Sequence, residues 1–246
     1  MQRVYVLDQG SYLRKSGSSL ALYKDRKLIE EIPAANLEHL VLMGYTSLTG
    51  AVMDFLIRNR VETVFLSPRG SFRGRLNIDD HKDVERRRHQ YLKLSDPDFV
   101  LKTAKAVVQG KLRNQARMLQ VHGQRSSSQQ VLSMALAVRT MAGNIPELGS
   151  LEMLRGVEGN AARAYFKAFG QLVKKSEFKF SARSKRPPLD PVNALLSFIY
   201  TMLTNEVLSA IKTAGLDPLL GALHEPSYGR PSLACDLVEE WRTYLG

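Results

Sequence analysis

Residues 224–241 gather the side chains that bind hard cations, although the chain as a whole is basic. The stretch reads HEPSYGRPSLACDLVEEW and sets one histidine and four acids against a single arginine, in a chain of formal charge +11. On a helix that begins at Ser232, Asp236 and Glu239 are three residues apart and share a face. Two neighbouring carboxylates repel each other unless a cation lies between them. With His224, which ends the apolar run LLGALH, these acids form a candidate metal site.

A further acid, Glu158, falls on the apolar face of a helix predicted over residues 150–170. It follows Leu154 by four residues and therefore shares its face. A buried carboxylate costs several kcal/mol unless it is paired or binds a metal. Gly156 and Gly159 flank it, and each costs about 1 kcal/mol relative to alanine in a helix. This pattern indicates that a neighbouring helix or a phosphate approaches the backbone closely.

Each of these residues also has an ordinary structural interpretation. Glu158 could pair with a buried arginine, His224 could donate to a core carbonyl, and Asp236 with Glu239 could be a solvated surface pair. Taken together, two or three carboxylates and one imidazole suit Mg²⁺ or Mn²⁺. A single cysteine, Cys235, argues against structural zinc and excludes an internal disulfide.

Two segments carry most of the positive charge. Residues 81–130 contain eleven Lys and Arg against four acids, and residues 163–186 contain eight against one. This concentration favours a phosphate-binding surface over simply solvated helix faces. The candidate DNA contacts are Lys102, Lys105, Lys111, Arg113, Arg117, Lys174, Lys175, Arg183, Lys185 and Arg186, with Tyr165 and Tyr200 as weaker candidates for which a core role is favoured.

The hydrophobic pattern predicts an α+β chain. Residues 1–76 form a β-rich domain, with one helix over 47–60 that Ser47 caps, and residues 77–95 are polar and assigned to a linker. Residues 96–246 form an α-helical catalytic domain. Its helices are predicted over 96–123, 130–143, 150–170 and 189–215 and from Ser232, with Gly170 and Gly215 at helix ends. No signal-peptide pattern is evident, and no run approaches the roughly 20 apolar residues of a membrane span.

Four stretches together resemble the CRISPR-associated endonuclease-integrase of spacer acquisition. They are VYVLDQGSYLRKSGSSLAL, LRGVEGNAARAYFKAF, RPPLDPVNALLSFIYTML and GLDPLLGALHEPSYGRPSLACDLVEEWR, so the likeness runs through nearly the whole chain. The resemblance implies an Mg²⁺ or Mn²⁺ ion held by Glu158 of the E-G-x-A-A motif, His224 of L-H-E and Glu239, which ends D-L-x-E. Asp236, which opens that last motif, is expected beside the site, or on a second ion when DNA is present.

The resemblance also implies a reaction and its partners. The 3′-OH of a prespacer DNA attacks a phosphodiester at the leader–repeat boundary of a CRISPR array, and a second attack follows at the far end of the repeat. The protein is expected in the prokaryotic cytoplasm, with no membrane association, as a homodimer through residues 1–76. A small ferredoxin-like CRISPR-associated partner would complete a heterohexamer. Relatives commonly continue with a proline where Thr243 follows Arg242 here, so contacts made by such a tail are outside this expectation.

Two other functions remain open at this point. The chain could be a general structure-selective nuclease acting on branched DNA, or a non-catalytic DNA-binding protein whose acids pair with its arginines. An acid cluster that repels itself also predicts that removal of Glu158 or Glu239 leaves thermal stability equal or higher in the absence of metal.

Overall fold

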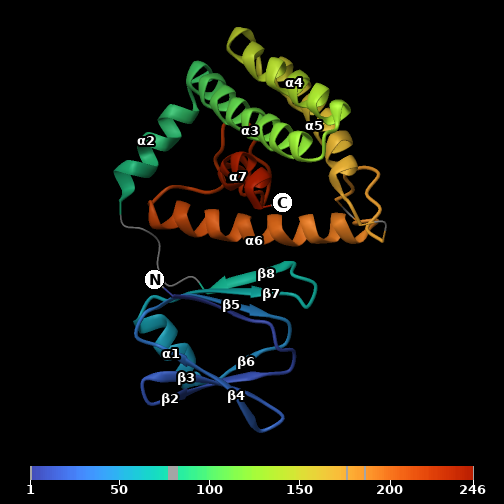
Figure 1. Cartoon of the computed structure of the whole chain (residues 1–246). Helices are drawn as coiled ribbons and strands as arrows, with labels where there is room; N and C mark the ends of the chain where they lie inside the picture. Colours follow the sequence, from blue (N-terminus) through green and yellow to red (C-terminus); the bar gives the residue numbers. More distant parts are fainter. Residues whose placement is uncertain (1, 77–82, 176, 186, 246) are drawn as a thin grey trace. The chain divides into compact units, whose positions relative to one another are not determined.

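The computed structural model describes residues 2–76, 83–175, 177–185 and 187–245 (Figure 1). The chain divides into two compact units, Met1–Asp80 and His81–Gly246. Strands dominate the first unit and helices the second, which confirms the predicted α+β class.

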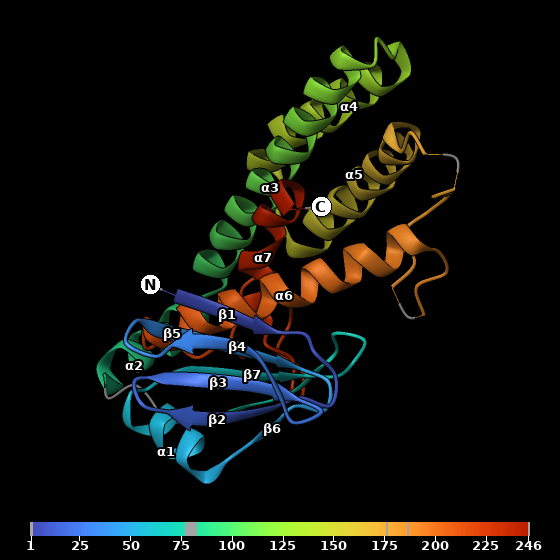
Figure 2. The ribbon, with the colours of Figure 1, turned by 60° about the horizontal axis from the view of Figure 1, so that its bottom comes forward.

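Two four-stranded sheets form the N-terminal unit (Figure 2). The first sheet has the order β1 (Gln2–Val6), β5 (Leu37–Met43), β7 (Glu62–Leu66), β8 (Phe72–Leu76). Its first three strands are parallel, and β8 is an antiparallel edge strand. The second sheet has the order β4 (Lys27–Pro33), β3 (Ser19–Lys24), β2 (Tyr12–Ser16), β6 (Ser47–Leu48).

Helix α1 (Gly50–Arg58) closes the core of this unit. Val52 and Leu56 lie one turn apart, are fully buried and share one core with Leu20 and Leu40 of the two sheets. The predicted cap at Ser47 is wrong, because Ser47 pairs with β2 as part of β6, and the helix begins three residues later.

Seven helical segments form the described part of the C-terminal unit. They are α2 (Val84–Leu94), α3 (Pro97–Arg125), α4 (Gln129–Asn144), the 3₁₀ turn η1 (Ile145–Glu147), α5 (Leu151–Leu172), α6 (Pro191–Thr213) and α7 (Ser232–Leu245). Five helices begin where a side-chain oxygen accepts a backbone N–H two or three residues ahead. These caps are Asp83, Asp96, Ser128, Ser150 and Asp190.

Helix α7 occupies the centre of this unit. It packs against α3 on one side and α6 on the other, while α3, α4 and α5 pack on one another (Figure 1). Ala234 and Val238 give α7 a fully buried face. The helix that carries Asp236 and Glu239 is therefore held by long neighbours on two sides.

Part of the expected linker is a helix. Residues 77–82 lie outside the described residues, but residues 84–94 form α2, which the sequence analysis assigned to the linker. None of the residues of α2 is buried, so it lacks the apolar stripe that would reveal a helix. Polar contacts hold it instead: Gln90 donates to the carbonyl of Asp217 at 2.9 Å and accepts from the backbone N–H of Asp217 at 2.7 Å.

The two glycines predicted to end helices have different roles. Gly215 follows α6 with φ of +74°, as a left-handed cap requires. Gly170 does not end α5, which continues to Leu172. A Cβ at Gly170 would lie 3.0 Å from the carbonyl oxygen of Phe180, so this glycine lets the segment after α5 pack against the helix.

Among the described residues, α6 is long and apolar enough to cross a membrane by length and composition alone. Within the chain, 28% of its apolar window is buried. Core helices of soluble proteins pass the same test, so this finding does not assign α6 to a membrane.

Candidate functional site

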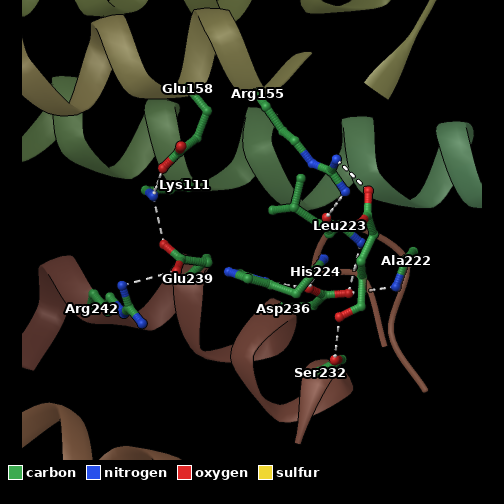
Figure 3. A network of polar contacts seen from close by, with 11 residues as sticks. Lys111, Arg155, Glu158, Ala222, Leu223, His224, Ser232, Asp236, Glu239 and Arg242 are labelled. Carbon is green, nitrogen blue, oxygen red and sulfur yellow. Dashed lines mark hydrogen bonds and ion pairs between the residues drawn. The ribbon is translucent and has the colours of Figure 1, made fainter. Parts of the chain in front are cut away.

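Glu158 and Glu239 converge on the ammonium group of Lys111 (Figure 3). The three side chains come from α5, α7 and α3 respectively. Lys111 Nζ forms an ion pair with Glu158 Oε1 and lies 2.6 Å from Glu239 Oε2. Lys111 is 6% exposed and Glu239 is 4% exposed. Two glutamates that are 81 residues apart in sequence thus share one buried cation.

A fourth charge completes this group. Arg242, one turn after Glu239 on α7, places Nη1 2.9 Å from Glu239 Oε1. Burial alone would lower the pKa of Lys111, but Glu239 and Glu158 outweigh it and hold that pKa above its usual value. Burial conversely raises the pKa of Glu239, and Lys111 and Arg242 reverse this, so that its pKa lies below the usual range. All four groups are therefore charged at neutral pH.

Lys111 was predicted as a DNA contact, and that assignment is wrong. Its ammonium is enclosed by protein carboxylates and is not offered to a solvent-exposed phosphate. The sequence held a signal for this position: Lys111 follows Val108 by three residues and Val107 by four, and both are buried. A lysine on the apolar face of a helix needs a buried partner.

Asp236 anchors the segment that carries His224. Its carboxylate is 2% exposed and accepts the backbone N–H groups of Ala222, Leu223 and His224 at 2.6, 2.9 and 3.0 Å. The same carboxylate lies 2.7 Å from His224 Nδ1. The second ring nitrogen, Nε2, points away from Asp236, and Figure 3 shows the imidazole extending toward Glu239. A carboxylate behind a histidine fixes the ring and leaves Nε2 to bind a metal.

Arg155 of α5 supports this segment from the other side. Its guanidinium donates to the carbonyl of Leu223 at 3.0 Å and to Glu225 Oε1 at 2.7 Å. Ser232, at the start of α7, donates to the carbonyl of Glu225 at 3.1 Å. Glu225 is thus paired with Arg155 and does not join the acids that surround Lys111.

Glycine is required at position 221 for this arrangement. A Cβ at Gly221 would lie 2.6 Å from Asp236 Oδ2 and 2.7 Å from the carbonyl carbon of Ser232. Real side chains do not tolerate such contacts with backbone, so the segment before His224 reaches Asp236 only because residue 221 has no side chain.

The glycines beside Glu158 are not explained by helix packing. A Cβ at Gly156 or Gly159 would meet no atom within 4 Å, so no neighbouring helix approaches there. That part of the sequence interpretation is wrong, and the alternative, a phosphate near this backbone, stays a prediction. The expected self-repulsion of the acids also loses its basis, because Glu158 and Glu239 are paired with Lys111 and Arg242.

A cavity of about 790 Å³ opens beside these residues. Glu158, His224 and Glu239 line it together with six basic side chains, which are Lys111, Arg163, Lys167, Arg183, Lys185 and Arg242. Burial lowers the pKa of Lys185, and the nearby positive charge of Arg242 lowers it further. Crowded cations of this kind favour an anionic ligand.

Aromatic rings form another part of the cavity lining. Tyr165 and Tyr200 both face it, and burial raises the pKa of each phenol. Tyr165 also packs against Phe166 and Phe169, which supports the favoured core role. The guanidinium groups of Arg183 and Arg242 lie 5.5 and 4.9 Å from the centre of the Tyr200 ring.

The predicted DNA contacts fall into three groups. Lys102, Arg113, Arg117, Lys174 and Lys175 are exposed, and Lys105 donates to the carbonyl of Pro146 at 2.9 Å. Lys185 lines the cavity, and Arg186 lies outside the described residues. Arg183 is used by the chain itself, because its guanidinium donates to Asn193 Oδ1 at 2.8 Å and to Ser197 Oγ at 3.1 Å.

Four functional candidates were missed or not assigned from the sequence. Arg163 and Lys167 line the cavity, and Arg155 and Arg242 fix its acidic side. Arg163 and Lys167 belong to the second basic segment, so their charge was noticed but not their place. Arg242 stands three residues after Glu239, a spacing at which opposite charges meet on a helix.

The donor set suits a hard divalent ion, but the donors are not assembled into a ready-made cluster. Within the described part of the chain, no three His, Cys, Asp or Glu side chains meet at one metal-binding point. Lys111 accounts for this, since its ammonium lies between the two glutamates. Two carboxylates already arranged around one cation, and an imidazole fixed by Asp236, fit Mg²⁺ or Mn²⁺.

Fold and site together define a two-unit α+β protein whose helical unit brings two glutamates and a histidine to a basic cavity. The model of the family described as CRISPR associated protein Cas1 matches residues 4–246, and the chain belongs to this family. The CRISPR-associated endonuclease Cas1 1 of Chlorobaculum tepidum is 34% identical over 252 residues, which cover all of this chain and 74% of the relative. CRISPR-associated endonuclease Cas1 3 of Thermus thermophilus is 38% identical over 244 residues, covering 98% and 71%.

Solved structures share the fold. A casposase bound to integration product has a TM-score of 0.82 at 23% identity, and the match covers all of this chain and 70% of that one. A Cas6-RT-Cas1–Cas2 complex gives a TM-score of 0.80 at 22% identity, covering 99% of this chain and 27% of that longer chain.

Two glycine substitutions should shift stability in opposite directions. Gly221→Ala should destabilise the protein by about 1–3 kcal/mol, because the new methyl group meets the Ser232 backbone. Gly156→Ala has open space and should stabilise α5 by about 1 kcal/mol. Urea unfolding of both variants measures the two effects. A Gly221→Ala protein as stable as wild type would show that the segment before His224 is not held tightly against Asp236.

Proposed function

We propose that this chain is a divalent-metal-dependent DNA endonuclease and integrase that joins the 3′ end of a prespacer DNA to a CRISPR array. One observation carries the proposal. Two glutamates from different helices share a single buried cation on the wall of a basic cavity, and a histidine oriented by Asp236 lines the same cavity.

Glu158, Glu239 and His224 Nε2 would hold the ion, which would be Mg²⁺ or Mn²⁺. When bound, such an ion polarises a phosphodiester and stabilises the charge that develops on its oxygens. The remaining work belongs to the chain. Asp236 keeps Nε2 of His224 directed to the cavity, and Arg242 holds one oxygen of Glu239 so that the other faces Lys111.

The cavity supplies the binding energy for DNA. Arg163, Lys167 and Lys185 present positive charge to a backbone that carries one negative charge per phosphate. Exposed Lys102, Arg113 and Arg117 of α3 would extend this attraction outside the cavity. Contacts of this kind are independent of sequence, so they position DNA without selecting it.

The proposed reaction exchanges one phosphodiester for another. The oxygen of the incoming 3′-OH forms a bond to phosphorus, and the bond from that phosphorus to the 3′ oxygen of the target strand breaks. The proton lost by the attacking hydroxyl is matched by one gained by the leaving 3′ oxygen. Bonds of the same kind are made and broken, so no nucleotide cofactor is needed.

The names of the relatives support this proposal. The two curated relatives are called CRISPR-associated endonucleases, and the casposase of the same fold is described as bound to integration product. Nuclease cleavage and strand joining use the same attack on phosphorus, with water or a 3′-OH as the nucleophile.

We extend the proposal to assembly. The strand-rich residues 1–76 are too few to bury all their apolar faces, so a homodimer through this unit is expected. A small ferredoxin-like partner would join two such dimers in a heterohexamer, and the similar fold in a Cas6-RT-Cas1–Cas2 complex supports a Cas2-type partner. Light scattering at micromolar concentration should give the mass of a dimer, and a monomer mass would contradict the expectation.

The function is tested by transfer of a labelled prespacer oligonucleotide into a plasmid that carries a CRISPR leader and repeat, with Mn²⁺ present. Glu158→Gln and Glu239→Gln should each reduce transfer by more than about 100-fold, because even residues behind a metal ligand change activity by about 10–100-fold. Asp236→Asn should fall within that smaller range. Matched controls are Glu152→Gln, exposed on α5, and Glu240→Gln, which lies against Gly110.

Three results separate the alternatives. Transfer that needs Mn²⁺ and both glutamates supports the proposal. Cleavage of branched DNA without any transfer would replace it with a structure-selective nuclease. Absence of both activities, with unchanged DNA binding by Glu158→Gln, would indicate a DNA-binding protein without catalysis.

A further inference from the structure

The ammonium of Lys111 occupies the place where a shared metal ion would lie. It contacts one oxygen of Glu158 and lies 2.6 Å from one oxygen of Glu239. Mg²⁺ binds its oxygen ligands at about 2.0–2.1 Å. An ion held by these same two oxygens therefore cannot enter while the ammonium remains between them.

The balance of charge leads to the same conclusion. Three carboxylates, Glu158, Glu239 and Asp236, face two cations, Lys111 and Arg242. A divalent ion added to all five would leave a surplus of positive charge in a largely buried site. An ion that replaces the Lys111 ammonium leaves the charges balanced. Uncompensated charge in such surroundings is costly, so exchange is favoured over addition.

We propose that Lys111 is an internal counter-ion that alternates with the divalent metal ion between Glu158 and Glu239. This inference rests on the metal site of the proposed function and assigns a role to a residue outside its ligand set. Without metal, the ammonium keeps the two carboxylates together. When metal binds, the ammonium leaves them.

The structure gives the displaced side chain a place to go. Lys111 itself lines the basic cavity, and a lysine side chain is flexible enough to redirect its ammonium. In the cavity it would meet other cations, so a DNA phosphate there is the partner that would hold it. Lys111 would thus link metal binding to DNA binding, since each ligand frees or occupies the group that the other requires.

Competition of this kind lowers the apparent metal affinity. The measured affinity is the intrinsic one multiplied by the fraction of molecules from which the ammonium has withdrawn. Lys111→Met keeps the length of the side chain and removes its charge, so every molecule becomes open to metal. If the ammonium is in place in at least nine molecules of ten, the substitution should tighten Mn²⁺ binding about tenfold or more.

The test is a calorimetric titration of full-length, DNA-free protein with Mn²⁺. Wild type is compared with Lys111→Met and with Lys102→Met, which removes the same charge from an exposed position on the same helix. Lys111→Met should bind Mn²⁺ at least about tenfold more tightly. Lys102→Met should stay within about twofold of wild type, because salt screens an exposed charge.

Thermal unfolding gives a second measurement that does not depend on calorimetry. Without metal, Lys111→Met should melt below wild type, because two buried carboxylates lose their shared cation. Saturating Mn²⁺ should raise its melting temperature more than that of wild type. The double variant Lys111→Met with Glu158→Gln should recover metal-free stability, since one of the unpaired charges is gone.

The outcomes distinguish this inference from the function on which it rests. If wild type binds Mn²⁺ and Lys111→Met binds it equally or more weakly, Lys111 does not compete with the metal and the inference fails alone. An equal gain in Lys102→Met would also overturn it, since any lost charge would then suffice. If neither wild type nor Lys111→Met binds Mn²⁺, the metal site of the proposed function fails and this inference fails with it.

Discussion

The buried carboxylate of Glu239 is the group on which the arrangement of the site depends. It is 4% exposed, and an ionised carboxylate removed from water must be compensated by nearby positive charge. Lys111 and Arg242 provide that charge, one at each oxygen. Because Lys111 also binds Glu158, this requirement draws α3, α5 and α7 together at one point. The cavity and its catalytic candidates follow from that meeting of helices.

Asp236 solves a different problem on the same helix. Its carboxylate accepts three backbone N–H groups from the segment that ends at His224, and it fixes the imidazole through Nδ1. A segment with no regular secondary structure thereby gains a defined position beside a rigid helix. Gly221 allows the close approach, and Arg155 holds the far side. The two acids of one motif thus have separate roles: Glu239 faces the cation and Asp236 faces the backbone.

Local pattern was enough to predict some of this and not the rest. The strands of the first unit and the long helices follow from apolar periodicity and from capping pairs such as Asp96 before Pro97. The burial of Glu158 and its need for a cation also followed from periodicity. The identity of that cation did not, because Lys111 meets Glu158 only through a contact 47 residues apart in sequence. Helix α2 was missed because polar contacts with the segment around Asp217, not an apolar face, hold it.

The central claim is that Glu158 and Glu239 share a site that a divalent ion and Lys111 occupy in turn. Anomalous diffraction at the manganese edge, from crystals grown with Mn²⁺, tests it most directly. The account predicts one strong peak at about 2.2 Å from Glu158, Glu239 and His224 Nε2, with Lys111 Nζ turned away from both carboxylates. A peak elsewhere, with Lys111 still bridging Glu158 and Glu239, would contradict it.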